Sequence, residues 1–474
     1  MKRRLFSILL AFALLISLAA CAKEKAPATA ETAEKPFVPT SAEALWEKAD
    51  SVMDALESYG IKQEMKMVFY ASGNKIETDA VAEGVYSNGE ENYYRYMTAK
   101  NHMVCQALSM DETIESKEAY YDGKMYRLNK STDVDQKLCS PISAEDYKEY
   151  EEDSLLEDVD FDDCMRKDFS GQEDGTWKLT FSGYTKKTIA LVMKEFDLDD
   201  EMLGADVLDM DVAMLTDGEF RVKELEIKFL FDLEENATTA PEFSIKASYD
   251  RYNEAKFDLE AFLPEEYTEV ANLLILDEFE KGIEEYQNSK KGKFVLTAKT
   301  ETKFMGQTVT EEEEDRVSYG EENGSFYYDL TAESAEGKVE MNYRGGVLKL
   351  TAGGESESGP QTEAEAKETV DGLIDSAEFA KEYVTAVEKS GEDTYLIKIA
   401  KLNEAEWSAA FQSQGMEYVS GSQEISVTFK DGKLTQYSSN YIIQGNVREG
   451  VQVENITVAT QTTLVFEAVA EQGA

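Results

Sequence analysis

The chain has 474 residues, of which 96 are Asp or Glu and 48 are Lys or Arg, so its formal net charge is −48. This acidity excludes an ordinary nucleic-acid-binding protein, because phosphate contacts need clustered Lys and Arg. Hydrophobic residues make up 42% of the chain and aromatic residues 11%, which is enough to bury real cores, and the length predicts two or three domains.

The N-terminus predicts a secretory signal over residues 1–20. A basic segment, Lys2 to Arg4, precedes an apolar run from Leu5 to Ile16, which is too short for a resident transmembrane helix. The segment from Leu18 to Cys21 resembles the lipobox of bacterial lipoproteins. The resemblance implies that the Cys21 thiol takes a diacylglyceryl group and that this residue becomes the new N-terminus. The alternative is an ordinary signal peptide followed by an unrelated cysteine.

Residues 21–40 are predicted to be the lipidated cysteine and a flexible tether. The segment is rich in Ala, Thr, Glu, Lys and Pro, and a flexible chain of this length reaches roughly 25 Å. Loss of residues 1–20 removes three basic side chains and no acidic ones, which takes the net charge to −51. Such an acidic chain is not attracted to anionic lipid, so charge cannot hold it at a membrane. The predicted partner is a lipid bilayer, to which the modified Cys21 anchors the chain. The expected location is the extracytoplasmic face of a bacterial membrane.

After the tether, the chain passes twice through the same order of elements. The first pass opens with a helix, where Thr40 and Glu43 fit a capping box, and a strand with alternating apolar residues follows over 61–69. The second pass opens with a helix around Leu276 to Tyr286 and a strand around 293–299. We therefore predict a tandem repeat, with domains over 41–267 and 272–470.

Later landmarks recur in matching order. Two-residue turns, Asp122-Gly123 and Gly345-Gly346, predict tight hairpins. Helices are then expected over 143–157 and 363–389. Each pass is expected to continue with a strand and a further helix, and to close with a hairpin, whose turns are Asp217-Gly218 and Asp431-Gly432.

Because strands come in blocks rather than alternating with helices, the predicted class is α+β. Each repeat is expected to be a curved antiparallel sheet, or half-barrel, covered by helices. This plan, with the lipobox, the helix-strand openings and the Asp-Gly hairpins, resembles the LolA/LolB and LppX-type lipoproteins. The resemblance covers each repeat once, and it implies an apolar cavity between sheet and helices for a lipid or lipid-like ligand.

Apolar residues at alternate strand positions would face the helices in such a fold. A dry packed core is the other interpretation of the same pattern. The residues that we predict for the cavity are Met65, Met67, Phe69, Leu225, Ile227, Phe229, Phe294 and Leu296.

No catalytic residue, metal site or cofactor is predicted. The chain has one histidine, His102, which removes most triad arrangements, and its cysteines lack zinc-binding spacing. Asp158, Asp160 and Asp162 have calcium-loop spacing, but Phe169 stands where such a loop needs a bidentate Glu. The acidic run from Glu311 to Asp315 is interpreted as a solvated strand end or loop.

The sequence therefore predicts a non-catalytic, membrane-anchored lipoprotein that binds a hydrophobic ligand or a protein partner. One alternative is the solute-binding lipoprotein of an ABC-type uptake system, although its lobes would need alternating βα units. Another is an envelope sensor or scaffold with no ligand.

Overall fold

The structure is a computed structural model of the whole chain. It describes residues 37–71, 74–87, 93–105, 110–132, 134–152, 164–195, 207–231, 241–256, 263, 266–322, 324–377, 379–413, 415–449 and 452–467. The predicted signal, Cys21 and the tether up to residue 36 lie outside these ranges, as do the acidic triplet from Asp158 to Asp162 and the end of the helix predicted over 143–157. The chain divides into two compact units, Met1–Tyr267 (unit 1) and Thr268–Ala474 (unit 2).

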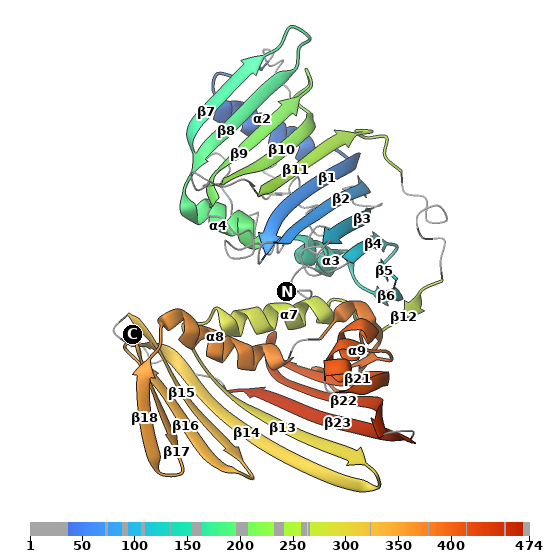
Figure 1. Cartoon of the computed structure of the whole chain (residues 1–474). Coiled ribbons are helices and arrows are strands. Elements are labelled where there is room, and N and C mark those ends of the chain that lie inside the picture. Colours follow the sequence, from blue (N-terminus) through green and yellow to red (C-terminus); the bar gives the residue numbers. More distant parts are fainter. Residues whose placement is uncertain are drawn as a thin grey trace. The chain divides into compact units, whose positions relative to one another are not determined.

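Unit 1 contains three described helices and eleven described strands (Figure 1). In chain order they are α2 (Ala42–Asp54), β1 (Ser58–Ala71), β2 (Asn74–Ser87), β3 (Tyr94–Cys105), β4 (Met110–Tyr121), β5 (Lys124–Lys130), β6 (Asp135–Pro141), α3 (Ala144–Glu152), β7 (Cys164–Gly171), β8 (Trp177–Tyr184), α4 (Lys186–Glu195), β9 (Val207–Thr216), β10 (Val222–Phe231) and β11 (Glu242–Asp250).

Unit 2 begins with the two-residue strand β12 (Thr268–Glu269). Its further helices and strands are α7 (Ile275–Gln287), β13 (Lys291–Phe304), β14 (Gln307–Glu322), β15 (Ser325–Ser334), β16 (Gly337–Arg344), β17 (Val347–Ala352), β18 (Glu355–Pro360), α8 (Glu363–Ile374), β19 (Val384–Lys389), β20 (Thr394–Ile399), α9 (Glu404–Ser413), β21 (Met416–Lys430), β22 (Lys433–Glu449) and β23 (Gln452–Phe466).

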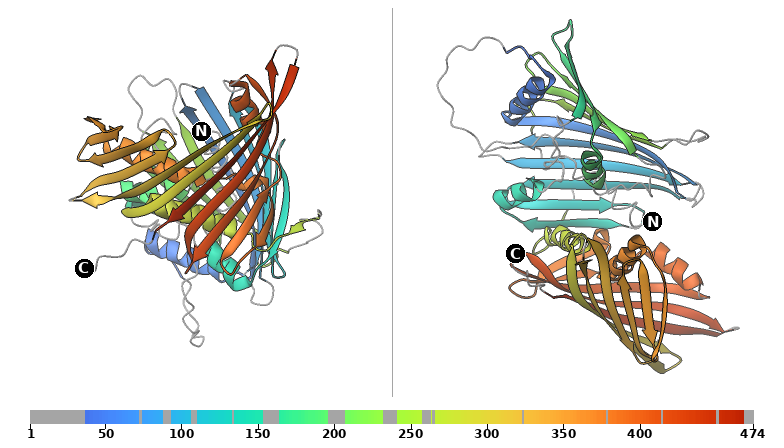
Figure 2. Two further views of the ribbon diagram at one scale, coloured as in Figure 1. Left: turned by 90° about the horizontal axis from the view of Figure 1, so that it is seen from below. Right: turned by 90° about the vertical axis from the view of Figure 1, so that its left-hand side faces the viewer.

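The two sheets share one strand order. In unit 1 the order is β6-β5-β4-β3-β2-β1-β11-β10-β9-β8-β7, and in unit 2 it is β18-β17-β16-β15-β14-β13-β23-β22-β21-β20-β19. The last strand of each unit therefore pairs with the first, β11 with β1 and β23 with β13, in antiparallel register. The strands of each sheet are long and twisted (Figure 2).

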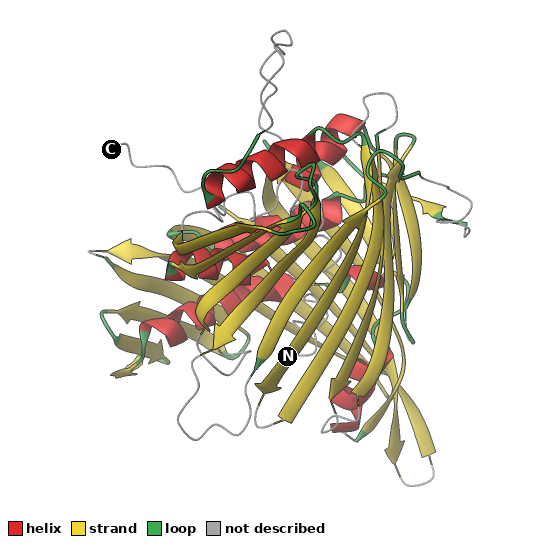
Figure 3. Cartoon of the chain, turned by 90° about the horizontal axis from the view of Figure 1, so that it is seen from above, coloured by secondary structure: helices red, strands yellow, loops and turns green. Residues whose placement is uncertain are grey.

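The predicted α+β class, with helix-covered half-barrels, is wrong. The structure is mostly β, with two large antiparallel sheets that do not close on themselves (Figure 3). The described helices are short, and they pack mainly against β7, β8 and β9 in unit 1 and against β15, β21 and β22 in unit 2. The helical share was overestimated because the helix expected over 363–389 ends at Ile374, and its last residues form the strand β19.

A further correction concerns the sheet closure and the first helix cap. The hairpins at Asp217-Gly218 and Asp431-Gly432 are present, but a third strand follows each of them and completes the sheet. At the first helix the N-cap is Ser41, whose hydroxyl accepts from the Ala44 amide at 3.2 Å, so the capping box predicted at Thr40 is wrong. A capping box does open α8, between Thr362 and Glu365.

The hairpin turns have the backbone conformation that the sequence predicts. Asp122, Gly123, Gly345 and Gly346 all have positive φ, as two-residue hairpins with mirror-image turns require. No disulfide joins the described cysteines, Cys105, Cys139 and Cys164. In the described part of the chain, no helix has the length and apolar character needed to cross a membrane.

Candidate ligand-binding face

In unit 1 the predicted cavity residues lie in a packed core. Met65, Met67 and Phe69 on β1 and Leu225, Ile227 and Phe229 on β10 are all buried in one hydrophobic cluster. That cluster also holds Leu45 and Ile189, which are buried residues of α2 and α4. Close packing of helix and sheet side chains therefore accounts for the burial of these positions.

In unit 2 the two predicted residues belong to a larger apolar surface on one side of the sheet. Side chains at alternate strand positions share a face, and residues paired across strands lie beside one another. This rule places a set of residues from five strands together, which we call the apolar face. Its members are Phe294, Leu296, Val317, Leu330, Val339, Met341, Leu348 and Leu350.

The pairing register makes one row of this face wholly apolar. Phe294 pairs with Val317, Val317 with Leu330, Leu330 with Met341, and Met341 with Leu350. At the β13 end the row is buried, with Phe294 and Val317 at 1% and 2% exposure. At the β16 and β17 end, the side chains of Met341 and Leu350 are partly exposed.

Helices α7 and α8 explain this gradient. The Tyr319 hydroxyl, on the same side of β14 as Val317, donates to the Tyr286 carbonyl at the end of α7. The Tyr286 ring stacks on Phe466, with centroids 3.6 Å apart. Helix α8 contacts β15. These contacts cover the β13 and β14 end of the row, whereas Met341 and Leu350 on β16 and β17 stay half-buried.

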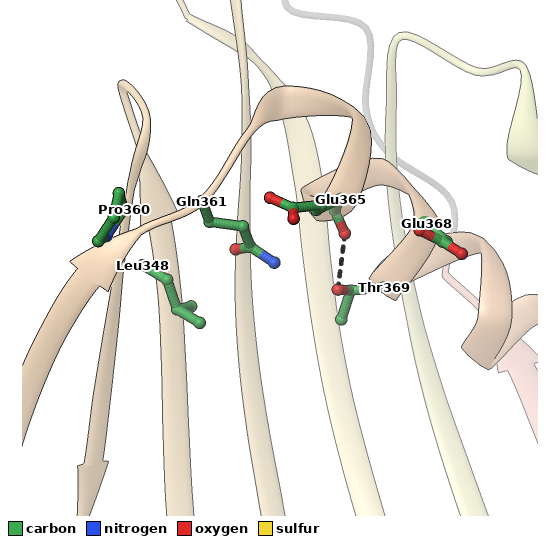
Figure 4. A pocket seen from close by; sticks show the side chains of 6 residues that line it. All are labelled: Leu348, Pro360, Gln361, Glu365, Glu368 and Thr369. Atoms are coloured by element: carbon green, nitrogen blue, oxygen red, sulfur yellow. Dashed lines mark hydrogen bonds between the residues drawn. The ribbon is translucent and has the colours of Figure 1, made fainter.

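A pocket of about 460 Å³ lies where α8 meets β17 and β18 (Figure 4). Leu348 of the apolar face lines it. The other lining residues come from the end of β18 and from α8, and they are Pro360, Gln361, Glu365, Glu368 and Thr369.

Two polar residues of this pocket, Glu365 and Thr369, form hydrogen bonds within the first turns of α8. Glu365 accepts from the Thr362 amide at 2.7 Å, which completes the capping box and lowers the pKa of Glu365. The Thr369 hydroxyl donates to the Glu365 carbonyl at 2.9 Å (Figure 4). These bonds leave the Glu365 carboxylate little freedom to bind a ligand.

Two buried polar atoms beside the pocket are not satisfied in this way. The Tyr328 hydroxyl and Oε1 of Gln361 have no hydrogen-bond partner among the described residues. Burial raises the pKa of Tyr328, although the nearby Thr369 and Gln361 side chains act in the opposite direction. Neither neighbour reaches hydrogen-bond geometry with the Tyr328 hydroxyl, so an unused donor lies near Gln361, whose Oε1 is an unused acceptor lining the pocket.

Sequence reasoning missed Asp315, a buried acidic residue next to Val317 and Leu296 of the apolar face. Its neighbours Glu311 to Glu313 are exposed, as expected for a solvated run, but Asp315 is only 9% exposed. Burial, and then repulsion from Glu313, raise the pKa of Asp315 to about 6. The signal was available, because alternation along β14 puts Asp315 on the same side as Val317 and Tyr319.

The matching region of unit 1 is closed and polar instead. Ser116 on β4 and Asn129 on β5 pair across the strands and are both buried, and Asn129 Nδ2 donates to Oε1 of Gln136 at 2.7 Å. Among the described residues, no group of three His, Cys, Asp or Glu side chains could hold a metal ion.

No known protein family and no curated protein sequence matches the chain. Among solved structures, a DUF1329 family protein from Desulfovibrio piger is similar at 11% identity and a TM-score of 0.16, covering 42% of this chain and 93% of that protein. A protein from Nitrosomonas europaea, solved under the provisional name AttH, has 6% identity and a TM-score of 0.15, covering 86% of this chain and 92% of its own. These similarities are too low to assign a fold or an activity.

Proposed function

We propose that this chain is a lipid-anchored protein of the extracytoplasmic membrane face that binds an apolar ligand without catalysing a reaction. The observation that carries the ligand proposal is the row of half-buried apolar side chains at Met341 and Leu350, beyond the cover of α7 and α8. The lipobox-like segment ending at Cys21 supports the anchor.

The free energy gained by burying an alkyl chain on this face limits the affinity to expect. Burial of one methylene group gains about 0.8 kcal/mol. A ten-carbon chain that is half buried against an open sheet face would therefore gain about 4 kcal/mol, which corresponds to millimolar affinity. An apolar face alone gives weak binding, so tighter binding needs either closure over the ligand or a contact with its head group.

The test uses the chain from residue 22 to 474, which keeps every described residue. Binding of 1-decanol is measured by calorimetry on the parent chain and on two variants of strand β17. Leu350→Gln places an amide on the apolar face, whereas Val347→Gln changes an exposed valine on the opposite side of the same strand. We expect Leu350→Gln to weaken binding at least fivefold and Val347→Gln to leave it unchanged.

Two results contradict the proposal. One is a parent chain that binds no decanol, together with native mass spectra that show no copurified ligand, which would favour a sensor or scaffold. The other is equal binding by both variants, which would place the ligand elsewhere on the chain.

A further inference from the structure

Asp315 occupies the border between the apolar row and a polar row of the unit 2 sheet. On β14 it stands between Val317, which belongs to the apolar row, and Glu313, which pairs with Ala298 and Ser334. Across the strands it pairs with Leu296 on β13 and Ala332 on β15. The carboxyl group therefore lies where the head group of a molecule would lie if its tail covered the half-buried part of the apolar face on β16 and β17.

Asp315 differs from two other acids of its strand, Glu312 and Glu314, which pair with cations. Glu312 pairs with Lys299 at 2.9 Å and Glu314 pairs with Arg316 at 2.5 Å, both on the opposite side of the sheet. Asp315 forms no ion pair or hydrogen bond with any residue that the structure describes, although it is more than nine-tenths buried. Burial makes ionisation of this carboxyl group less favourable, and a bound cation would offset that cost.

We propose that Asp315 binds the protonated amine of a single-chain cationic amphiphile, whose hydrocarbon tail lies along the apolar face. This inference rests on the proposed function, because it needs the tail to bind there. The half-buried side chains of Ala332, Val339, Met341 and Leu350 form a path away from Asp315. This path crosses three strand spacings from β14 to β17, about 14 Å, which suits a medium-length alkyl chain. Its far end reaches Leu350, next to the pocket residue Leu348.

Charge excludes the other single-chain amphiphiles as preferred ligands. A fatty acid would bring its carboxylate beside Asp315 and Glu313, on a chain whose net charge is already −48. A neutral alcohol would gain the apolar contact but leave the Asp315 charge without a partner. Only an amphiphile with a cationic head group supplies both the apolar contact and a partner for the Asp315 charge. An ammonium–carboxylate contact away from water is a strong, charge-assisted hydrogen bond.

The electrostatic surroundings of Asp315 are simple enough for a clean test. The residues that face it from β13 and β15, Leu296 and Ala332, carry no charge, and Glu313 is the titratable neighbour on its own strand. A bound cation favours the ionised carboxylate. Amine binding should therefore release a proton near pH 6, where free Asp315 is partly protonated, and none at pH 8.

The experiment compares decylammonium, 1-decanol and decanoate by calorimetry, with the chain from residue 22 to 474 at 150 mM salt. We expect the parent chain to bind decylammonium at least tenfold more tightly than decanol, and decanoate most weakly. Asp315→Asn, which keeps the shape of the side chain, should reduce this preference to about twofold. Glu311→Gln removes an exposed charge from the same strand and should preserve the preference.

The outcomes separate the two proposals. If decanol binds but decylammonium has no advantage, or if Asp315→Asn keeps that advantage, the role of Asp315 is overturned while the ligand-binding function stands. If none of the three compounds binds, the proposed function fails as well. Proton release by the parent chain tests the role of Asp315 without any variant. It is measured by calorimetry in buffers of different ionisation enthalpy. If decylammonium binding releases no proton at pH 6, the role of Asp315 is also overturned.

Discussion

Glu118 and Arg127 form a largely buried ion pair across strands β4 and β5 of unit 1, with the guanidinium Nη2 3.2 Å from Oε2 of the carboxylate. They are the fourth pair counted from the Asp122-Gly123 turn. In unit 2, the fourth pair from the Gly345-Gly346 turn is Met341 and Leu350. The same sheet position therefore holds a closed polar contact in one unit and a half-buried apolar one in the other.

The first prediction concerns this ion pair. Arg127→Leu alone should destabilise unit 1 by up to about 3–5 kcal/mol, because it removes the guanidinium from the half-buried Glu118 carboxylate. The double variant Glu118→Met with Arg127→Leu, which copies unit 2, should recover most of that loss. Denaturant unfolding followed by Trp46 and Trp177 fluorescence measures both. A double variant as unstable as the single one would contradict the argument.

The second prediction concerns Asp315 without ligand. Its pKa in the folded chain is about 6 against an ordinary value of 3.8, so the folded state binds more protons than the unfolded state between these values. Stability should therefore fall as pH rises from about 4 to 6 and stay low above that. Asp315→Asn should stabilise unit 2 at pH 7.5 by on the order of 1–3 kcal/mol, and hardly at all at pH 4.

Trp407, the tryptophan of unit 2, reports this transition in a chain that carries Phe at the two other tryptophan positions. Glu311→Gln serves as the control, since its side chain is exposed and should change stability little. Equal stabilisation by both variants at pH 7.5 would show that net charge, rather than burial of Asp315, causes the effect.

The third prediction compares two glycines inside helices of unit 2. A Cβ at Gly282 of α7 would lie 2.7 Å from the Leu434 Cβ of β22, so Gly282→Ala must push the helix off the sheet. We expect a loss of about 1–3 kcal/mol. A Cβ at Gly372 of α8 would meet no atom within 4 Å, so Gly372→Ala should gain about 0.5–1 kcal/mol. Thermal unfolding of the two variants should move in opposite directions.

The fourth prediction concerns Cys21. Two acyl chains on one cysteine anchor a protein stably, whereas an unmodified chain with this net negative charge gains nothing from anionic lipid. The parent chain expressed with its leader should partition into the detergent-rich phase, and Cys21→Ala should move it to the aqueous phase. Cys164→Ser, at a partly exposed thiol, is the control. A parent chain found in the aqueous phase would argue against lipidation.

Local sequence patterns predict much of the order of helices and hairpins along the chain. Helical periodicity marks α2 and α7, and the Asp-Gly and Gly-Gly pairs mark hairpins, because each depends on residues close in sequence. The pairing of β11 with β1 and of β23 with β13 joins distant segments, and no local pattern encodes it. Val384–Lys389 shows the same limit: the segment was predicted as helix, but pairing with β20 makes it a strand.

The candidate site was predictable only in part. Phe294 and Leu296 lie on the apolar face, but the helices cover less of that face than a helix-covered half-barrel would require. Asp315 was missed because a run of acidic residues is usually exposed to solvent. Its position in the alternation of strand β14 puts its side chain on the buried side instead. The contrast between Glu118 with Arg127 and Met341 with Leu350 emerged only from the strand register.

The central position of the last strand of each unit has a consequence for biosynthesis. A chain that emerges N-terminus first presents β1 early but cannot complete that sheet until β11 follows, and β13 must likewise wait for β23. Each first strand keeps an unpaired edge throughout this interval, so such topologies fold slowly and are exposed to misassociation meanwhile. Premature termination before β23 would leave unit 2 as two separate half-sheets, each with an open edge where its partner strand belongs.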